Sequence, residues 1–196
     1  MDNFRNDAEA ASLAKPSASK ASKASKDGYW KKVSGRQLPA FFSEIREEAG
    51  AGLPCVFVCI GTDRSTGDAL GPLVGSMLDE AGYSVIGTLE HPCDASNLVQ
   101  RLAEIPAGAA VIGIDACLGQ PSSVGLYQVS NRPIFPGKSL GKNLPLVGDY
   151  TVAAIVNADG PRQYAVLQTT SLNRVMGMAR EIAGAVQAAF PPPIRA

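Results

Sequence analysis

The chain has 196 residues, of which 45% are hydrophobic and 18% are charged, a composition that suits one globular domain and is too apolar for a disordered protein. The 18 basic and 18 acidic residues cancel, and residues 51–196 hold more acids than bases, so the folded part lacks the basic surplus of a nucleic-acid-binding domain. The sequence shows neither a run of 18 apolar residues nor a signal-peptide core, so we expect a cytoplasmic protein whose folded domain binds neither membrane nor nucleic acid.

Residues 1–27 are predicted to be a disordered tail, because a Ser/Ala/Lys repeat runs through them and offers nothing large to bury. The lysines of this repeat are more typical of a solvated linker than of a tether to nucleic acid or a membrane surface. Residues 28–53 are expected to form an N-terminal helix and a linker. Apolar residues recur at helical spacing in Gly35–Glu48, which is the predicted helix.

Residues 54–190 alternate between strand and helix patterns, which predicts an α/β sandwich. The apolar run Cys55–Ile60 is typical of a central strand in a covered parallel sheet. Gly148–Asn157 is interpreted as a helix that Asp149 would cap, although its β-branched residues weaken the helix assignment. Residues 191–196 are a Pro-rich end. Further strands are expected at Tyr83–Leu89, Ala109–Ile114, Gly125–Ser130 and Tyr164–Thr169, and helices at Leu70–Ala81, Asn97–Glu104 and Leu172–Ala189.

Carboxylates follow three of the predicted strands. Asp63 and Asp68 follow the first strand, Glu90 comes with His91 after the second, and Asp115 ends the third. Ligands bind to open α/β sheets outside the carboxyl ends of the strands, so we expect these side chains to share one edge. For Asp63 and Asp68 the competing interpretation is a cap on the following helix.

Asp68 and Asp115 form the predicted catalytic pair. Two carboxyl groups side by side can have separated pKa values, one staying protonated while the other ionises, which supports general acid–base activation of water. The same two residues are candidate ligands of a divalent metal ion, with Glu90 or His91 as a further ligand. Both interpretations describe a hydrolase.

Other catalytic patterns are weaker. The loop after the first strand has neither the glycine spacing nor the lysine of a P-loop, and the dinucleotide-binding fingerprint Gly-x-Gly-x-x-Gly is absent. Any Ser-His-Asp or Cys-His site would depend on His91, the single histidine, and no Gly-x-Ser-x-Gly motif occurs. Cys117 is interpreted as a buried structural thiol.

The stretch Ile60–Gly75 reads Ile-Gly-Thr-Asp-Arg-Ser-Thr-Gly-Asp-Ala-Leu-Gly-Pro-Leu-Val-Gly and resembles the signature of the YyaC-type sporulation proteins, relatives of the spore germination protease. Five further segments match that family in order, so the resemblance covers roughly residues 54–185. They are Gly87–Leu89, Ile114–Gly119, Gly148–Asp149, Ile155–Asn157 and Val166–Thr170.

The resemblance implies a phosphorylase/hydrolase-like, three-layer α/β/α sandwich with a mostly parallel central sheet. It is similar to the germination protease and, more distantly, to hydrogenase maturation proteases. In the germination protease two aspartates are held to be catalytic, and their positions match Asp68 and Asp115; in the maturation proteases the corresponding acids bind metal. Asp94 and Ser171 stand where the family pattern has a histidine and an arginine, which puts a metal ligand or a substrate contact in question.

The resulting hypothesis is a spore-protease-like peptidase of the cytoplasm or forespore, acting on a protein or peptide during sporulation or germination and requiring no cofactor. The alternatives are a non-catalytic sporulation-associated binding protein on the same fold and a metal-dependent maturation-type endopeptidase. Amides near Gly67 are expected to bind the developing oxyanion, and Asp63 to support Asp68. The full set of expected supporting or substrate-binding residues is Thr62, Asp63, Gly67, Glu90 and Asp149.

Overall fold

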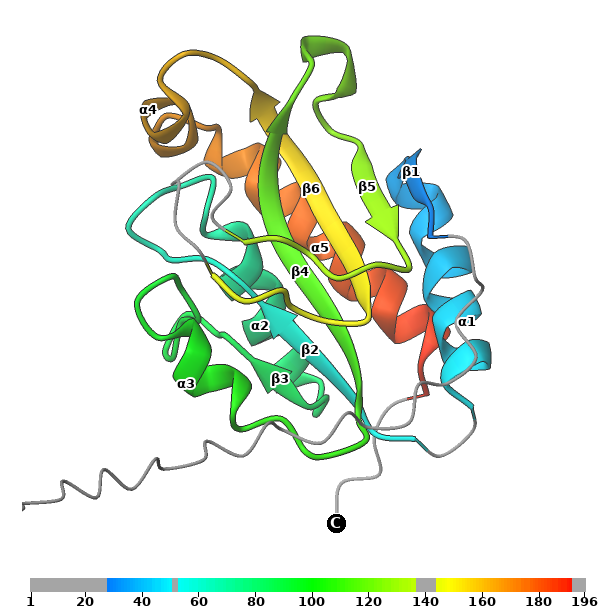
Figure 1. The fold of residues 1–196 in the computed structure, drawn as a ribbon. Coiled ribbons are helices and arrows are strands. Elements are labelled where there is room, and N and C mark those ends of the chain that lie inside the picture. The colour runs from blue at the N-terminus through cyan, green and yellow to red at the C-terminus, as the bar shows by residue number, and fades with distance from the viewer. Residues whose placement is uncertain (1–27, 51–52, 137–143, 192–196) are drawn as a thin grey trace, which may run out of the picture.

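The computed structural model describes residues 28–50, 53–136 and 144–191 of the chain (Figure 1). The predicted tail, residues 1–27, and residues 192–196 of the predicted Pro-rich end lie outside the described residues. The described residues form a six-stranded sheet in the order β1-β5-β6-β4-β2-β3. Its strands are β1 (Trp30–Val33), β2 (Cys55–Cys59), β3 (Val85–Ile86), β4 (Ala110–Gly119), β5 (Tyr127–Ser130) and β6 (Tyr150–Ala158).

The sheet is mixed and mostly parallel. β3, β2, β4 and β6 run parallel to one another, whereas β5 is antiparallel to β6 and β1 is antiparallel to β5. The carboxyl ends of the parallel strands therefore point to one edge, where the loops that follow them meet. This topology confirms the predicted α/β class with its mostly parallel sheet.

Helices cover the two faces of the sheet unequally. α1 (Leu38–Ala49), α2 (Leu70–Glu80) and α5 (Leu172–Ala189) pack together on one face, behind the sheet in Figure 1. The short α3 (Leu98–Leu102) lies on the other face. In the described ranges, no helix is both long enough and apolar enough to cross a membrane. The remaining elements are α4 (Gln163–Gln168) and the 3-10 helices η1 (Gly35–Gln37) and η2 (Pro121–Ser123).

Apolar residues of the central strands alternate between two cores. On β4, Ile112 and Ile114 face the larger core under α1, α2 and α5, while Val111 and Cys117 face the smaller core on the α3 side. Alternation of this kind follows from the pleat of a strand. Because both faces are covered, the central strands are apolar throughout, which is the pattern that identified them in the sequence.

Helix α2 lies directly against the backbone of the sheet. A Cβ at Gly71 would clash with the carbonyl oxygen of Ile60, and a Cβ at Gly75 would clash with that of Gly87. Only glycine fits at these two positions of the helix. The helix therefore has a fixed place on β2 and β3, and so does the loop that leads into it.

Two segments differ from the sequence predictions. Gly148–Asn157, interpreted as a possible helix capped by Asp149, overlaps strand β6, which lies between β4 and β5 and is buried from Tyr150 to Val156. Tyr164–Thr169, predicted as a strand, overlaps helix α4. Leu167 is buried there while Tyr164 is 58% exposed, because only one side of this short helix packs against the rest of the chain.

Two further differences concern strand ends. β4 was expected to end at about Asp115, but it continues to Gly119 because β6 pairs with it that far. Residues 28–53, predicted as a helix and a linker, also contain β1, which pairs with β5 at the edge of the sheet. The helix predicted at Gly35–Glu48 is confirmed as η1 followed by α1.

Candidate active site

Asp115 lies on β4 at the level where the neighbouring strand β2 ends. The last ladder pair between the two strands joins Cys59 to Ile114, whereas β4 continues beside β6 to Gly119. The loop that follows β2 therefore passes next to Asp115. Strand alternation directs the Asp115 side chain to the α3 side of the sheet, the side that Cys117 also faces.

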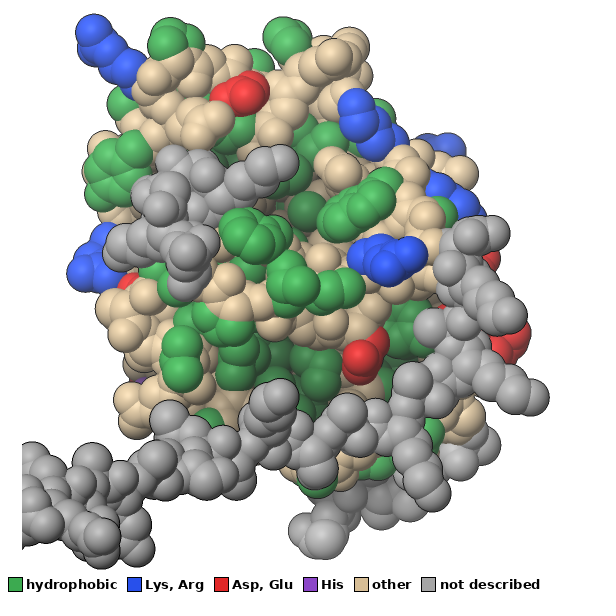
Figure 2. All heavy atoms as spheres, in the orientation of Figure 1, with side chains coloured by type: hydrophobic (Ala, Val, Ile, Leu, Met, Phe, Trp, Pro, Cys, Tyr) green, Lys and Arg blue, Asp and Glu red, His purple; other side chains and the backbone are tan. Residues whose placement is uncertain are grey.

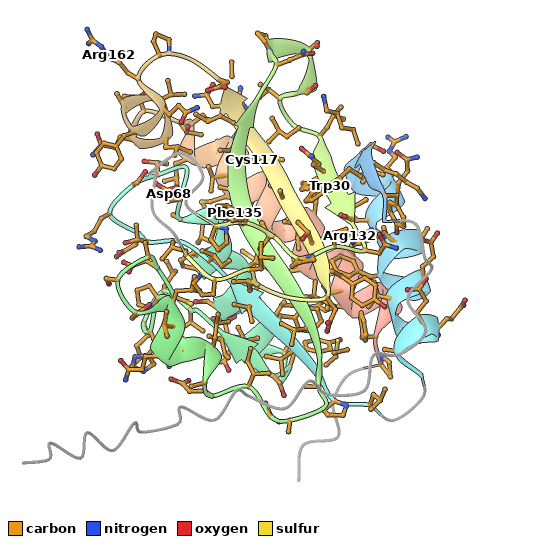
Figure 3. All side chains as sticks on the ribbon, viewed as in Figure 1. Trp30, Asp68, Cys117, Arg132, Phe135 and Arg162 are labelled. Atoms are coloured by element: carbon orange, nitrogen blue, oxygen red, sulfur yellow. The ribbon has the colours of Figure 1, made fainter. Side chains whose placement is uncertain are left out.

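Asp68 lies near the end of that loop (Figure 3), and backbone hydrogen bonds hold the loop in place. The Thr62 N–H donates to the Asp68 carbonyl oxygen at 3.2 Å, and the Gly61 N–H donates to the Cys93 carbonyl oxygen at 2.8 Å. Gly61 has φ +144°, and a Cβ at this position would clash with the Asp68 carbonyl oxygen. Glycine at position 61 thus lets the loop fold back and bring Asp68 to the sheet.

Gly67 connects the other side of the loop to α4. Its N–H donates to the carbonyl oxygen of Leu167 in α4 at 2.9 Å, and a Cβ on Gly67 would lie 2.8 Å from Leu167 Cδ2. The loop after β2 and the segment after β6 are therefore in direct contact here. Because the Gly67 N–H is already engaged, the amides expected to bind an oxyanion are its neighbours in the loop.

The two aspartates have different electrostatic surroundings. Burial raises the pKa of Asp115 to about 8; the Ala116 N–H, which donates to Asp115 Oδ1 at 2.8 Å, opposes this rise, and the negative charge of Asp68 adds to it. The charge of Asp68 acts on Asp115, as expected for two carboxyl groups at the same edge of the sheet. Burial also raises the pKa of Asp68, and the nearby Ser65 hydroxyl opposes that rise. With its pKa near 8, Asp115 keeps its proton at neutral pH.

Ser65 belongs to this site although its sequence position drew no prediction. The residue is 3% exposed, and among the described residues its Oγ has no hydrogen-bond partner of ordinary geometry. A signal was present, because Ser65 and Asp68 have the Ser-x-x-Asp spacing of a capping box. Neither residue caps α2, whose N-cap is Ala69 without a side-chain bond. The competing interpretation of Asp68, as a cap on the following helix, is therefore wrong.

Cys117 lies two residues beyond Asp115 on the same face of β4. Burial raises the pKa of Cys117 to about 12, the charge of Asp115 adds to the rise, and Lys32 opposes it. A thiol with this pKa stays protonated at neutral pH and is a poor nucleophile. Directly after Cys117 the pairing of β4 with β6 shifts by a bulge, a feature common beside functional sites.

Asp149 lies away from the pair, so its predicted place in the site is wrong. Its Oδ2 accepts a hydrogen bond from the Val111 N–H at 2.9 Å, and its own N–H donates to the Val111 carbonyl oxygen at 2.7 Å. Val111 precedes Asp115 by four residues, about 13 Å along a strand. Asp149 therefore closes the amino-terminal edge of the parallel strands, opposite the edge where Asp68 lies.

Glu90, His91 and Asp63 are exposed side chains that the structure does not bring to the pair. Glu90 Oε1 and His91 Nε2 lie 3.8 Å apart, and neither residue contributes to the pKa shifts of Asp68 or Asp115. The Asp63 side chain forms no hydrogen bond to any described residue. Support for Asp68 comes from Ser65 rather than from Asp63.

The donor set does not fit a metal site with three protein ligands. The described parts of the chain contain no group of three or more His, Cys, Asp and Glu side chains that could hold a metal ion. Asp68 and Asp115 supply carboxyl oxygens, but His91, the predicted third candidate, lies exposed beside Glu90. A zinc centre of the usual hydrolase type takes three protein ligands, so no catalytic step is assigned to a metal here.

Asp94 and Ser171, where the chain departs from the family pattern, both make structural contacts. Asp94 Oδ2 pairs with Arg64 Nη2 at 2.9 Å, which ties the loop after β2 to the segment after β3. Ser171 is the N-cap of α5, and its Oγ accepts a hydrogen bond from the Arg174 N–H at 3.5 Å.

Comparisons with known proteins match most of the chain. The pattern of a family described as "Protein of unknown function (DUF1256)" matches residues 31–185. A Bacillus subtilis (strain 168) protein described as "Uncharacterized protein YyaC" is 44% identical over 157 residues, which are 77% of this chain and 76% of that protein. The crystal structure of the NiFe hydrogenase maturation protease HycI from Thermococcus kodakarensis KOD1 is similar with a TM-score of 0.44 and 19% identity, covering 72% of this chain and 97% of that one.

Proposed function

The chain belongs to the DUF1256 family, and we propose that it is a peptidase in which Asp68 and Asp115 activate water to hydrolyse a peptide bond, in a sporulation or germination context. One observation supports the proposal: Asp115 lies on β4 beside the carboxyl-terminal end of β2, and burial together with the charge of Asp68 raises its pKa to about 8. Such a pair holds one proton at neutral pH. It therefore offers an acid and a base at the same place.

The chemistry follows from that proton. Asp68, as carboxylate, accepts a proton from a water molecule whose oxygen attacks the carbonyl carbon of the substrate. Asp115 donates its proton to the leaving nitrogen as the C–N bond breaks. The products are a carboxylic acid and an amine, and the pair again holds one proton, now on Asp68. Transfer of that proton to Asp115 restores the starting state.

Charge on the substrate oxygen needs hydrogen-bond donors. The Gly67 N–H is engaged by Leu167, but the N–H groups of Thr66 and Asp68 donate no hydrogen bond within the described residues. They lie in the same loop as Asp68 and are the donors we assign to the oxyanion. Cys117 takes no part as a nucleophile, because its thiol stays protonated at neutral pH.

Cleavage of a mixed pool of spore proteins and peptides tests the proposal. We expect Asp68→Asn and Asp115→Asn each to lower kcat/KM by roughly a hundredfold or more, the usual value of positioned acid–base catalysis. Asp149→Asn is the matched control, because it removes one carboxylate outside the site and keeps an oxygen that can accept from Val111. Its activity should equal that of the wild type.

Three results would contradict the proposal. Full activity of Asp68→Asn would remove the carboxylate base. Loss of wild-type activity in a chelator would favour the metal-dependent endopeptidase. No cleavage by folded wild-type protein, on a pool that an active relative digests, would favour a sporulation-associated binding protein on the same fold.

A further inference from the structure

β1 is an outer strand of the sheet, and one side of it has no partner strand among the described residues. The Tyr29 N–H donates to Asn131 Oδ1, and the Tyr29 carbonyl oxygen accepts from Ser130 Oγ, so the backbone of Tyr29 faces β5. Backbone groups of an antiparallel strand alternate in direction. Those of Trp30 and Lys32 therefore point outward, with an N–H and a carbonyl oxygen each.

The side chains at this edge are basic and aromatic. Trp30 is 50% exposed, and Lys31 and Lys32 follow it directly. Lys31 Nζ lies 4.3 Å from the centre of the Tyr29 ring, and Lys32 Nζ donates to Ser123 Oγ at 2.9 Å. Neither lysine is paired with a carboxylate in the described ranges.

The two lysines lie on opposite faces of the sheet. Val33 packs against the core under α1, α2 and α5, so alternation places Lys31 on that helix side and Trp30 and Lys32 on the side that Asp115 faces. Glu44 and Glu48 act on Tyr29 from the helix side. Lys32 lies on the other side, next to the exposed ring of Trp30, and forms no ion pair with a carboxylate of the described residues.

From these observations we propose that the β1 edge is a docking site for an extended acidic protein segment, which adds to the sheet as a further strand. Its backbone would pair with the outward groups of Trp30 and Lys32, as in other cases of strand addition. Acidic side chains next to Lys32 and an apolar one against Trp30 would complete the contact. A second copy of this chain is a poorer partner, because it would bring two more lysines to the same edge.

This site is separate from the aspartate pair. β5 and β6 lie between β1 and β4, which puts the strands of Lys32 and Asp115 about 14 Å apart at the usual strand spacing. In Figure 3, Trp30 and Asp68 lie on opposite sides of β4 and β6, and Figure 2 shows basic and hydrophobic side chains together on this face. The inference therefore stands whether or not the protein is a peptidase.

Fluorescence anisotropy with a labelled peptide of alternating Glu and Val, about eight residues long, tests the proposal on the full chain. We expect the Glu peptide to bind at least about tenfold more tightly than a Lys/Val peptide of the same length, because only the former complements the edge. Methylating alternate amide nitrogens of the Glu peptide keeps its charge and should abolish binding to the wild type.

Lys32→Pro and Lys32→Ala separate backbone pairing from charge. Both remove the ammonium group, but only proline removes the outward N–H, and no ladder bond within the chain depends on that N–H. We expect Lys32→Pro to bind the Glu peptide at least about tenfold more weakly than Lys32→Ala, at equal circular dichroism and Tm.

Equal affinity of the two variants, equal affinity for the Glu and Lys peptides, undiminished binding of the methylated peptide, or no saturable binding by the folded wild type would each overturn the proposal. So would a dimer in sedimentation that Lys32→Pro dissociates, since the edge would then bind a second copy.

Discussion

Asp68 and Asp115 have the same type of side chain, but the two carboxyl groups have different surroundings. Asp115 lies within the sheet beside the end of β2, whereas Asp68 lies in a loop next to a serine hydroxyl. Their place at the same edge of the sheet could be predicted, because loops after neighbouring parallel strands meet there. The difference in burial could not, since it depends on packing around each carboxyl group. The prediction for Asp149 was wrong because the residues after it were interpreted as a helix that Asp149 caps, whereas they form strand β6.

The raised pKa of Asp115 makes stability depend on pH. A folded state that holds a proton more tightly than the unfolded chain is stabilised by it below the ordinary pKa of 3.8, and loses this stabilisation as the pH rises to about 8. We expect the free energy of unfolding of the wild type, from urea titration, to fall by a few kcal/mol between pH 5 and pH 8 relative to that of Asp115→Asn. The magnitude follows because a tenfold difference in proton affinity between the folded and unfolded states corresponds to about 1.4 kcal/mol.

Asp115→Asn is the control for the wild type in that experiment, because asparagine has nearly the same shape as aspartate and does not titrate. Parallel pH profiles of the two proteins would show that the Asp115 carboxyl has an ordinary pKa. The acid–base role proposed for it would then lose its support.

At the scale of elements, the loop between β2 and α2 sets the geometry of the site. We expect Gly61→Ala to lower the free energy of unfolding by about 2 kcal/mol more than Gly108→Ala does, measured by urea denaturation. Both glycines have positive φ, +144° and +82°, so alanine strains the backbone at either position. Only at Gly61 would the added Cβ also meet the backbone of Asp68; nothing lies within 4 Å at Gly108.

The same comparison should separate folding from chemistry. A Gly61→Ala protein that is as stable as Gly108→Ala would mean that the loop moves aside without cost. The predicted dependence of the Asp68 position on Gly61 would then be wrong.

Elements whose local pattern agrees with their burial were predicted well. β2, α2 and α5 are examples, because an apolar run or a helical stripe in each coincides with its buried face. β6 and α4 were assigned wrongly, and both depend on neighbours far along the chain. β6 is a strand because β4 and β5 flank it, and Tyr164 lies on an exposed helix surface. β1 was missed because four residues with two lysines give no strand pattern without β5 beside them.

At the scale of the whole molecule, the C-terminal end of α5 meets helix α1 and strand β2. The Phe190 ring, directly after α5, lies 6.4 Å from that of Phe42 in α1 and 5.7 Å from that of Phe57 in β2, edge to face in both cases. The Tyr83 hydroxyl donates to the Phe190 carbonyl oxygen at 3.0 Å. An N-terminal helix, a central strand and the C-terminal helix are thereby held in one cluster.

We expect Phe190→Ala to lower the free energy of unfolding by about 2–3 kcal/mol, because it removes a partly buried ring between α1, β2 and α5. Leu172→Ala, at the other end of α5 where the side chain is 55% exposed, should change it by less than about 0.5 kcal/mol. Thermal and urea unfolding of the two variants would measure both effects. Equal stabilities would contradict the role given to the aromatic cluster.

The direct contact between α2 and the sheet backbone has a consequence for how this protein can change over evolutionary time. Gly71 and Gly75 bring the helix against the carbonyl groups of Ile60 and Gly87. No side chain lies between helix and sheet at these two points, so a change in side-chain size there cannot compensate for a movement of the helix. The loop from β2 to α2 must then span a constant gap. Point substitutions at its exposed positions leave that span unchanged, whereas an insertion or deletion of one residue would displace Asp68 from Asp115. We therefore expect descendants of this chain to vary in composition in this loop while keeping its length.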